Sequence, residues 1–229
     1  MIPETVKRLK NKLIVSCQAA PGEPLYGPAF MAAMAKSAEL AGAGAVRING
    51  AADIAATRQA VNIPVIGILK RQSPETRAYI TPDFRCARQL VEAGADIVAL
   101  DATNAFRTEP LEELIFKITN ELKVPVFADV SNFSEGIKAA AYGAAIVAST
   151  LSGYKTYNAG IASPDFKLIT RLAVNIAVPV VCEGLVNSPE EAARALRAGA
   201  WAVVVGTAIT RPREIAAKFA AAMKAEVPA

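Results

Sequence analysis

The strongest constraint on the fold is a pair of short phrases that alternate along the chain. One is a turn of Ala or Tyr, Gly and Ala that leads into an apolar run, at 43–48, 93–98, 142–147 and 198–203. The other is a proline followed by an apolar run, at 63–66, 124–127 and 178–181. Glycine suits the left-handed residue that ends a helix, whereas proline is tolerated at the first residue of a strand. The alternation therefore predicts repeated units of one helix and one strand.

Together with the run at 13–15, these phrases give eight short apolar segments. Their Val, Ile and Leu residues are continuous, which is typical of parallel strands buried on both faces. Stretches rich in Ala, Leu, Glu, Lys and Arg separate them and are expected to be helices, for example at 84–92, 111–122, 189–197 and 213–224. Thr81, Ser163 and Ser188 each precede a proline and are expected to cap helices.

Eight strands that alternate with eight helices predict an α/β fold, a single (β/α)8 TIM barrel with its helices outside. We expect one catalytic domain over residues 1–229, because no linker or low-complexity segment divides the chain. The alternative is an open, doubly wound sheet. It is disfavoured because no GxGxxG follows the first strand.

Composition excludes several classes of function. The chain has no histidine, which removes the Ser-His-Asp mechanism and most zinc sites. Its 25 Lys and Arg exceed its 21 Asp and Glu by only 4, and they are scattered, so we expect no nucleic-acid partner. The longest uncharged run, at 139–154, is too short and too polar to span a bilayer, so we expect no membrane partner.

The cysteines, Cys17, Cys86 and Cys182, form no CxxC pair and indicate a reducing compartment, so we expect a cytoplasmic protein. A nucleophilic thiol needs a cation or a base as partner, and with no histidine the case for one is thin. We therefore interpret all three as small apolar packing residues.

Polar residues follow nearly every predicted strand, where barrel enzymes build their sites. They are Ser16, Cys17 and Gln18 after the first strand, Arg47 and Asn49 after the second, Lys70 after the third, Asp101 after the fourth, Asp129 after the fifth, Ser149 and Thr150 after the sixth, Glu183 after the seventh, and Gly206 and Thr207 after the eighth. Each alone could be a solvated loop residue, but together they predict one polar mouth.

Lys70 and Glu183 are the predicted catalytic residues at this mouth. Lys70 ends a buried strand, where burial or neighbouring cations lower the pKa of an amine and make it a base or a Schiff-base nucleophile. The alternatives are a lysine that reaches solvent and a glutamate that only pairs with a cation of the site.

The loops after the seventh and eighth strands predict a phosphate site. Gly184 follows Glu183, and Gly206 and Thr207 are followed by a helix start and Arg211. Loops in these positions are the usual phosphate site of barrel enzymes, and arginine adds a charge-assisted hydrogen bond. An ordinary turn and cap is the alternative.

The chain resembles the N-acylglucosamine-6-phosphate 2-epimerase family over nearly its whole length. The phrase at 206–212 is shared by many barrels, but the combination is specific. The matching motifs are VSCQA at 15–19, MAAMAK at 31–36, VRING at 46–50, IGILKR at 66–71, YITP at 79–82, ALDAT at 99–103, ADVS at 128–131, TLSGY at 150–154 and GTAITRP at 206–212.

This resemblance implies a TIM barrel that interconverts N-acetylmannosamine 6-phosphate and N-acetylglucosamine 6-phosphate in sialic-acid breakdown, without metal or cofactor. The family's catalytic lysine and glutamate fall on Lys70 and Glu183. Its substrate contacts fall on Gln18, Arg47, Asp129 and Arg211. A phosphorylated amino sugar is thus the implied partner.

Two positions depart from the family pattern. Leu185 stands where the family usually has a basic residue, and Lys155 stands where it usually has threonine. Lys155 could replace the lost charge near the phosphate. These departures bear on fine substrate preference and leave the implied reaction unchanged.

The residue inventory suits inversion at carbon 2 of an open-chain amino sugar. A neutral lysine can remove the carbon-2 proton, and Arg47 and Gln18 can stabilise the enolate or orient the acyl group. Asp129 could hold a sugar hydroxyl. Glu183 could act in ring opening or return a proton, and both roles remain open.

Two other functions are compatible with parts of this inventory. One is a Schiff-base aldolase that uses Lys70 covalently. The other is a catalytically silent phosphosugar-binding protein, which would need neither Lys70 nor Glu183. The apolar, alanine-rich segment at 215–223 also predicts a homodimer, as the resemblance suggests.

Overall fold

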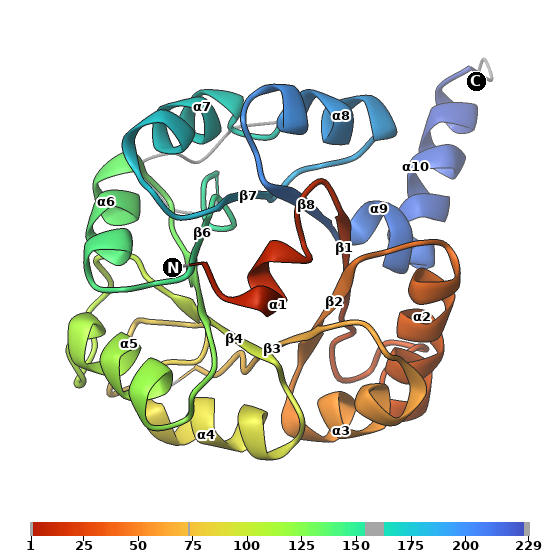
Figure 1. Cartoon of the computed structure of the whole chain (residues 1–229). Coiled ribbons are helices and arrows are strands. Elements are labelled where there is room, and N and C mark those ends of the chain that lie inside the picture. Colours follow the sequence, from red (N-terminus) through yellow and green to blue (C-terminus); the bar gives the residue numbers. More distant parts are fainter. Residues whose placement is uncertain (1, 73, 154–162, 227–229) are drawn as a thin grey trace.

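The chain folds as a closed barrel of eight parallel strands in sequence order, surrounded by helices (Figure 1). The structure is a computed structural model that describes residues 2–72, 74–153 and 163–226. The strands are β1 Leu13–Cys17, β2 Ala45–Asn49, β3 Val65–Ile68, β4 Ile97–Asp101, β5 Val126–Asp129, β6 Ile146–Ala148, β7 Val180–Glu183 and β8 Ala202–Val205. β1 pairs with β8, for example Val15 with Val205, and this pairing closes the barrel. The predicted (β/α)8 fold is confirmed.

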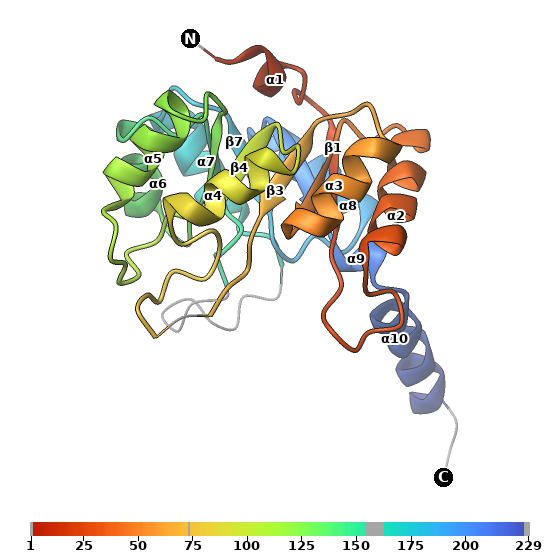
Figure 2. The same cartoon turned by 90° about the horizontal axis from the view of Figure 1, so that it is seen from below.

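The outer helices follow the expected alternation. They are α2 Pro28–Leu40, α3 Ala51–Ala60, α4 Phe84–Glu92, α5 Leu111–Asn120, α6 Phe133–Ala141, α7 Phe166–Asn175 and α8 Pro189–Arg197, and the last strand is followed by α9 Thr207–Thr210 and α10 Pro212–Ala225. Figure 2 shows α10 projecting away from the barrel, and none of its residues is buried. α10, the long helix after the eighth strand, therefore does not join the ring of helices as α2 to α8 do.

Glycine has the expected role in three of the four turns. Gly94, Gly143 and Gly199 have positive φ values of 105°, 94° and 101°, which L residues rarely adopt. In the first turn this role falls instead to Gly42, whose φ is 91°. Gly44 is required there for space, because a Cβ at this position would lie 2.5 Å from the Lys12 Cβ.

Only one of the three predicted helix caps is confirmed. Ser188 accepts a hydrogen bond from the Glu191 N–H and caps α8. α4 begins at Phe84, as the expected range 84–92 has it, but its cap is Asp83 and not Thr81, and α7 is capped by Asp165 and not Ser163. Thr81 is instead drawn into the barrel, where its hydroxyl donates to the Ala99 carbonyl at 2.6 Å.

A short helix, α1 (Glu4–Lys7), closes the end of the barrel at which the strands begin (Figures 1 and 2). Val6 and Leu9 are fully buried with the interior residues of the strands. The Trp201 indole donates to the Val6 carbonyl at 3.1 Å, and the Asn11 N–H donates to the Trp201 carbonyl at 2.7 Å. This end of the interior is packed, so the open mouth lies at the carboxyl ends of the strands.

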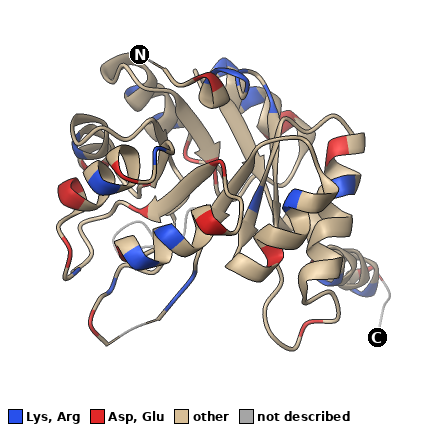
Figure 3. Ribbon diagram, turned by 60° about the horizontal axis from the view of Figure 1, so that its bottom comes forward, with Lys and Arg blue, Asp and Glu red and all other residues tan. Residues whose placement is uncertain are grey.

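Positions occupied by Lys or Arg alternate with positions occupied by Asp or Glu along the ribbon of the outer helices (Figure 3). Several form exposed or half-exposed ion pairs, such as Lys36 with Glu39 and Arg58 with Asp96. Within residues 2–72, 74–153 and 163–226, no helix combines the length and the apolar character that crossing a membrane requires.

Candidate active site

The alternation of side chains along each strand carries polar residues into the mouth. Inside the barrel, Ala45, Phe127 and Val181 belong to the interior apolar cluster. The residues two positions further on are Arg47, Asp129 and Glu183. Because side chains in a strand alternate between faces, these three also point toward the barrel axis, one layer closer to the mouth.

A cavity of about 560 Å³ opens at this mouth. It holds residues from nearly every strand end, as barrel enzymes do. Its lining residues are Ser16, Gln18, Arg47, Lys70, Tyr79, Ile80, Asp101, Thr150, Leu151, Glu183, Gly184, Leu185, Val186, Asn187, Val204, Gly206, Thr207, Thr210 and Arg211.

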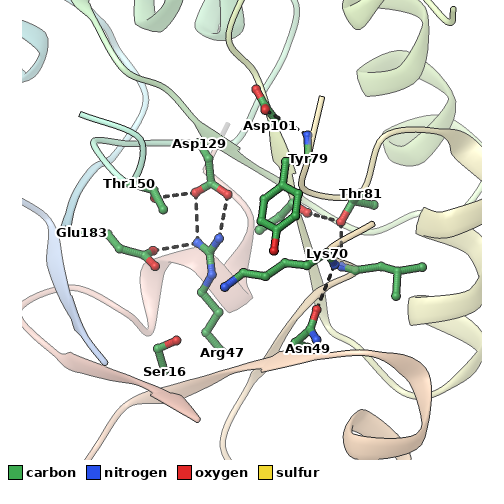
Figure 4. A network of polar contacts seen from close by, with 12 residues as sticks. Ser16, Arg47, Asn49, Lys70, Tyr79, Thr81, Asp101, Asp129, Thr150 and Glu183 are labelled. Atoms are coloured by element: carbon green, nitrogen blue, oxygen red, sulfur yellow. Dashed lines mark hydrogen bonds and ion pairs between the residues drawn. The ribbon is translucent and has the colours of Figure 1, made fainter. Parts of the chain in front are cut away.

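Arg47 is the centre of a buried charge cluster (Figure 4). Its guanidinium donates two hydrogen bonds to the Asp129 carboxylate, at 3.0 and 2.6 Å, and one to Glu183 Oε2 at 2.7 Å. The Thr150 hydroxyl donates to Asp129, and the Arg47 guanidinium lies 5.2 Å from the centre of the Phe127 ring. Only 1% of the Arg47 side chain is exposed, so the cluster holds one cation and two carboxylates away from bulk water.

The charges of this cluster and its burial explain why the pKa of Glu183 is raised. Burial, with a smaller contribution from the Asp129 carboxylate, raises this pKa to about 7 against the opposing charges of Arg47 and Lys70. One guanidinium cannot fully compensate two carboxylates, and the bidentate contact belongs to Asp129. Glu183 is therefore the member of the cluster that can take up and release a proton near neutral pH.

Lys70 faces this cluster from the other side of the mouth (Figure 4). It lies just beyond the end of β3, where its backbone N–H donates to Asn49 Oδ1 at 2.9 Å. Burial and the neighbouring Arg47 charge lower the pKa of its amine, and Glu183 and Asp129 act in the opposite direction. In a closed ring of eight strands in sequence order, β3 and β7 lie opposite one another, so Lys70 and Glu183 approach the cavity from opposite sides.

The other end of the cavity is formed by the loops after β7 and β8. Gly184 has a φ of 102°, and Leu185 has a φ of 60°, which is uncommon for a branched residue. Gly206 precedes α9, and Arg211 follows it. The Arg211 guanidinium forms ion pairs with Glu23 and with Glu214, the latter at 3.1 Å. Arg211 is thus a half-exposed cation at the edge of the cavity.

Gln18 lies between these two ends. Its side-chain amide donates to the Ser16 hydroxyl at 2.7 Å. Its carbonyl oxygen is buried and has no hydrogen-bond partner among residues 2–72, 74–153 and 163–226. An acceptor in this state is ready to receive a hydrogen bond from a bound molecule.

The structure places eight of the nine residues expected in the site on the cavity surface: Gln18, Arg47, Lys70, Glu183, Gly184, Gly206, Thr207 and Arg211. Asp129 is the exception, because it is fully buried behind Arg47. Its carboxylate is occupied by Arg47 and Thr150, so the structure gives it an anchoring contact rather than a place on the cavity wall. Lys155 lies outside the described residues.

The cysteines take no part in this site. Cys17, Cys86 and Cys182 are buried and unpaired with one another, and burial raises their thiol pKa values to about 12, 11 and 12. The described residues also contain no group of three or more His, Cys, Asp or Glu side chains that could hold a metal ion.

Tyr79 is a cavity residue that strand-end reasoning missed. It follows no strand, and it reaches the mouth because the segment at 79–81 runs antiparallel to the chain around Lys70. The only signal for it in the sequence is its place in the YITP motif at 79–82.

A closed parallel barrel whose mouth gathers polar residues from nearly every strand end has the architecture of a TIM-barrel enzyme. The particular family follows from comparison with known proteins. Residues 31–225 match the family model described as "Putative N-acetylmannosamine-6-phosphate epimerase". The chain belongs to this family.

Individual relatives agree with this assignment. A protein of Caldanaerobacter subterraneus subsp. tengcongensis, named "Putative N-acetylmannosamine-6-phosphate 2-epimerase", is 47% identical over 224 residues, which cover 96% of this chain and 94% of the relative. The solved structure of the N-acetylmannosamine-6-phosphate 2-epimerase from Clostridium perfringens superposes with a TM-score of 0.91 at 38% identity, and covers 96% of both chains. Thiamine phosphate pyrophosphorylase from Pyrococcus furiosus shares the fold alone, with a TM-score of 0.61 at 18% identity.

Proposed function

We propose that this chain acts as a single catalytic domain that interconverts N-acetylmannosamine 6-phosphate and N-acetylglucosamine 6-phosphate, as part of amino-sugar breakdown. The observation that carries the proposal is the placement of Lys70 and Glu183 on opposite sides of one cavity, with pKa values displaced toward each other. Inversion at a carbon requires the proton to leave from one face and return to the other. Two proton-transfer groups that face one another suit this requirement.

The reaction begins with opening of the sugar ring, because only the open-chain aldehyde acidifies the carbon-2 proton. The neutral Lys70 amine removes this proton, and the electron pair moves onto the aldehyde oxygen. Glu183, in its protonated form, then gives a proton to carbon 2 from the opposite face. In the reverse direction the two groups exchange roles.

Arg47 stabilises the negative charge that develops on the aldehyde oxygen. Two hydrogen bonds to Asp129 hold the Arg47 guanidinium in place before the substrate binds. This supports the role, because a cation that is already in position needs little rearrangement when the negative charge develops. The unsatisfied carbonyl of Gln18 accepts a hydrogen bond from the substrate. Gly184, Gly206, Thr207 and Arg211 hold the 6-phosphate at the other end of the cavity.

The test is turnover of N-acetylmannosamine 6-phosphate in heavy water, followed by proton NMR. At early times the product should carry deuterium at carbon 2 and the remaining substrate should not, because the two groups exchange protons separately with solvent. Label appearing equally in both sugars would contradict separate proton donors. A lack of turnover, together with an adduct at Lys70 after borohydride treatment, would favour an aldolase instead.

We also propose that the protein is a homodimer that uses α10, and that it works in the cytoplasm. Phe219 and Met223 on this projecting helix are 69% and 71% exposed, a cost that a partner surface would remove. The substitutions Phe219→Glu and Met223→Glu should convert the dimer to a monomer in light scattering. Val174→Glu, at an exposed apolar residue of α7, is the matched control. Cell fractionation tests the location.

A further inference from the structure

Tyr79 is an exposed aromatic side chain on a rigidly held segment of the cavity wall. The residue is 42% exposed and lines the same cavity as Lys70 and Arg47. In Figure 4 its hydroxyl points toward the Lys70 side chain. No step of the proposed reaction uses it.

The backbone around Tyr79 is held from several directions. The Arg71 N–H donates to the Tyr79 carbonyl at 3.0 Å, and the Thr81 N–H donates to the Leu69 carbonyl at 2.8 Å. These two bonds flank Lys70, which forms an antiparallel bridge with Ile80. The position of the Tyr79 ring is thereby tied to the position of the reacting amine.

Asp101 also supports the backbone of this segment through hydrogen bonds. Its carboxylate is fully buried and accepts from the Tyr79 N–H at 3.2 Å through Oδ2. Its Oδ1 accepts from the Thr103 N–H at 2.9 Å and the Thr103 hydroxyl at 2.6 Å, and its backbone N–H donates to the Ile80 carbonyl at 2.8 Å. A buried carboxylate placed in this way fixes the backbone of a residue whose ring stays free.

The chemistry at carbon 2 decides what lies against this ring. When Lys70 reaches the carbon-2 proton, the groups nearest to Lys70 are those bonded to carbon 2, and one of them is the N-acyl group. The acyl end is an apolar alkyl group, which packs well on an aromatic face. We propose that Tyr79 forms the wall of the acyl-group subsite and sets the size of acyl chain that the enzyme accepts, with Asp101 as its positioning residue. This inference depends on the proposed function.

The experiment measures kcat/KM for N-acetyl- and N-propanoyl-mannosamine 6-phosphate in parallel. In Tyr79→Ala the ratio of propanoyl to acetyl activity should rise about tenfold, because the lost ring leaves space for the added methylene, and one methylene in an apolar pocket typically changes selectivity by at least this factor. Tyr79→Phe should keep the wild-type ratio, because the ring and not the hydroxyl forms the wall. Tyr79→Leu should lie between them.

Phe106→Ala is the matched control. Phe106 is 65% exposed on the next loop, and its carbonyl accepts from the Arg77 N–H of the same segment, yet it does not line the cavity. Its removal should leave the ratio unchanged. Asp101→Asn should raise the ratio by less than Tyr79→Ala, and should add nothing further in a Tyr79→Ala background.

An unchanged ratio in Tyr79→Ala, with an active wild-type enzyme, overturns the acyl-group assignment and leaves the proposed function intact. An inactive wild-type enzyme overturns the proposed function. In that case the same variants are compared by calorimetric affinity for the two sugar phosphates, and an unchanged affinity ratio again contradicts the role of Tyr79.

Discussion

The Lys70 end of the cavity is built from strand-end residues with buried polar atoms, whereas the Arg211 end is built from loops and a helix start that stay partly exposed. At the first end, the Arg47 and Asp129 side chains are 1% exposed or less. At the second, Arg211 and Glu214 each keep about 30% of their side-chain exposure, 30% and 29%. Charges interact strongly where water is excluded and weakly where it screens them. The first end therefore suits chemistry and the second suits reversible binding.

Removing the lysine amine should have the largest effect. Lys70→Ala should lower kcat by about 10²–10⁴-fold, the usual contribution of a general base, while phosphosugar affinity changes little. Lys70→Arg should be almost as inactive, because a guanidinium keeps the charge but cannot become neutral. Steady-state kinetics and calorimetry measure the two quantities. Near wild-type turnover in Lys70→Arg would mean that the base is another group.

Removing the central cation should be next in size, and should affect stability as well as rate. Arg47→Ala leaves Asp129 and Glu183 buried without compensation, which costs about 3–5 kcal/mol of unfolding free energy for a broken buried pair. Chemical denaturation at pH 8 gives this value.

The loss in Arg47→Ala should shrink on lowering the pH to about 5. Arg47 lowers the pKa of Glu183, so its loss raises this pKa further, and protonation on lowering the pH stabilises the native variant more than the native wild type. Equal losses at both pH values would contradict the assignment of a buried, charged Glu183.

At the exposed end, Arg211→Ala should weaken binding of N-acetylmannosamine 6-phosphate by roughly ten- to hundredfold, the value of a charge-assisted hydrogen bond of about 1.5–3 kcal/mol. Binding by the wild type should weaken with added salt, because this end is open to solvent. Calorimetry at two salt concentrations measures both. Unphosphorylated N-acetylmannosamine is the control. Equal affinity for both sugars would contradict the assignment of the 6-phosphate to the Arg211 end of the cavity.

The smallest effect near neutrality concerns the pH profile. The Lys70 and Glu183 pair works with one shared proton, so kcat/KM should rise through about pH 7 as the pair loses its first proton and fall when it loses the second. In Glu183→Gln the measurable step is removal of the carbon-2 proton by Lys70, followed as exchange of that hydrogen with heavy water; its pH profile should lack the limb near pH 7 and rise toward the lysine range. A limb that persists in Glu183→Gln would assign it to another group.

Much of the barrel and its mouth could be predicted from the sequence, because both depend on local periodicity. Lys70 and Glu183 end continuous apolar runs, Arg47 lies one residue before the end of another, and alternation along a strand indicates the side to which each points. The burial of Asp129 could not be predicted, since it depends on which of two carboxylates takes the bidentate contact with Arg47.

The unpredicted parts depend on contacts between distant segments. Tyr79 reaches the cavity, and Thr81 fails to cap α4, for the same reason: the segment at 79–81 pairs with the chain around Lys70. α1 is a single turn whose burial depends on Trp201, 195 positions from its partner Val6. Its sequence alone has too few apolar residues to show that it closes the barrel.

Because α1 closes one end of the barrel, the N-terminal end of the described chain and the substrate entrance lie at opposite ends of the barrel. Figure 2 shows α1 at the top of the barrel and α10 projecting from the bottom. The mouth of the cavity lies at the carboxyl ends of the strands, opposite α1. An affinity tag, a solid support or a fused protein joined before α1 would lie at the closed end of the barrel and would leave the entrance of the cavity unobstructed. Both epimers must enter and leave through this entrance. Each epimer therefore competes with the other for the cavity as the reaction approaches equilibrium.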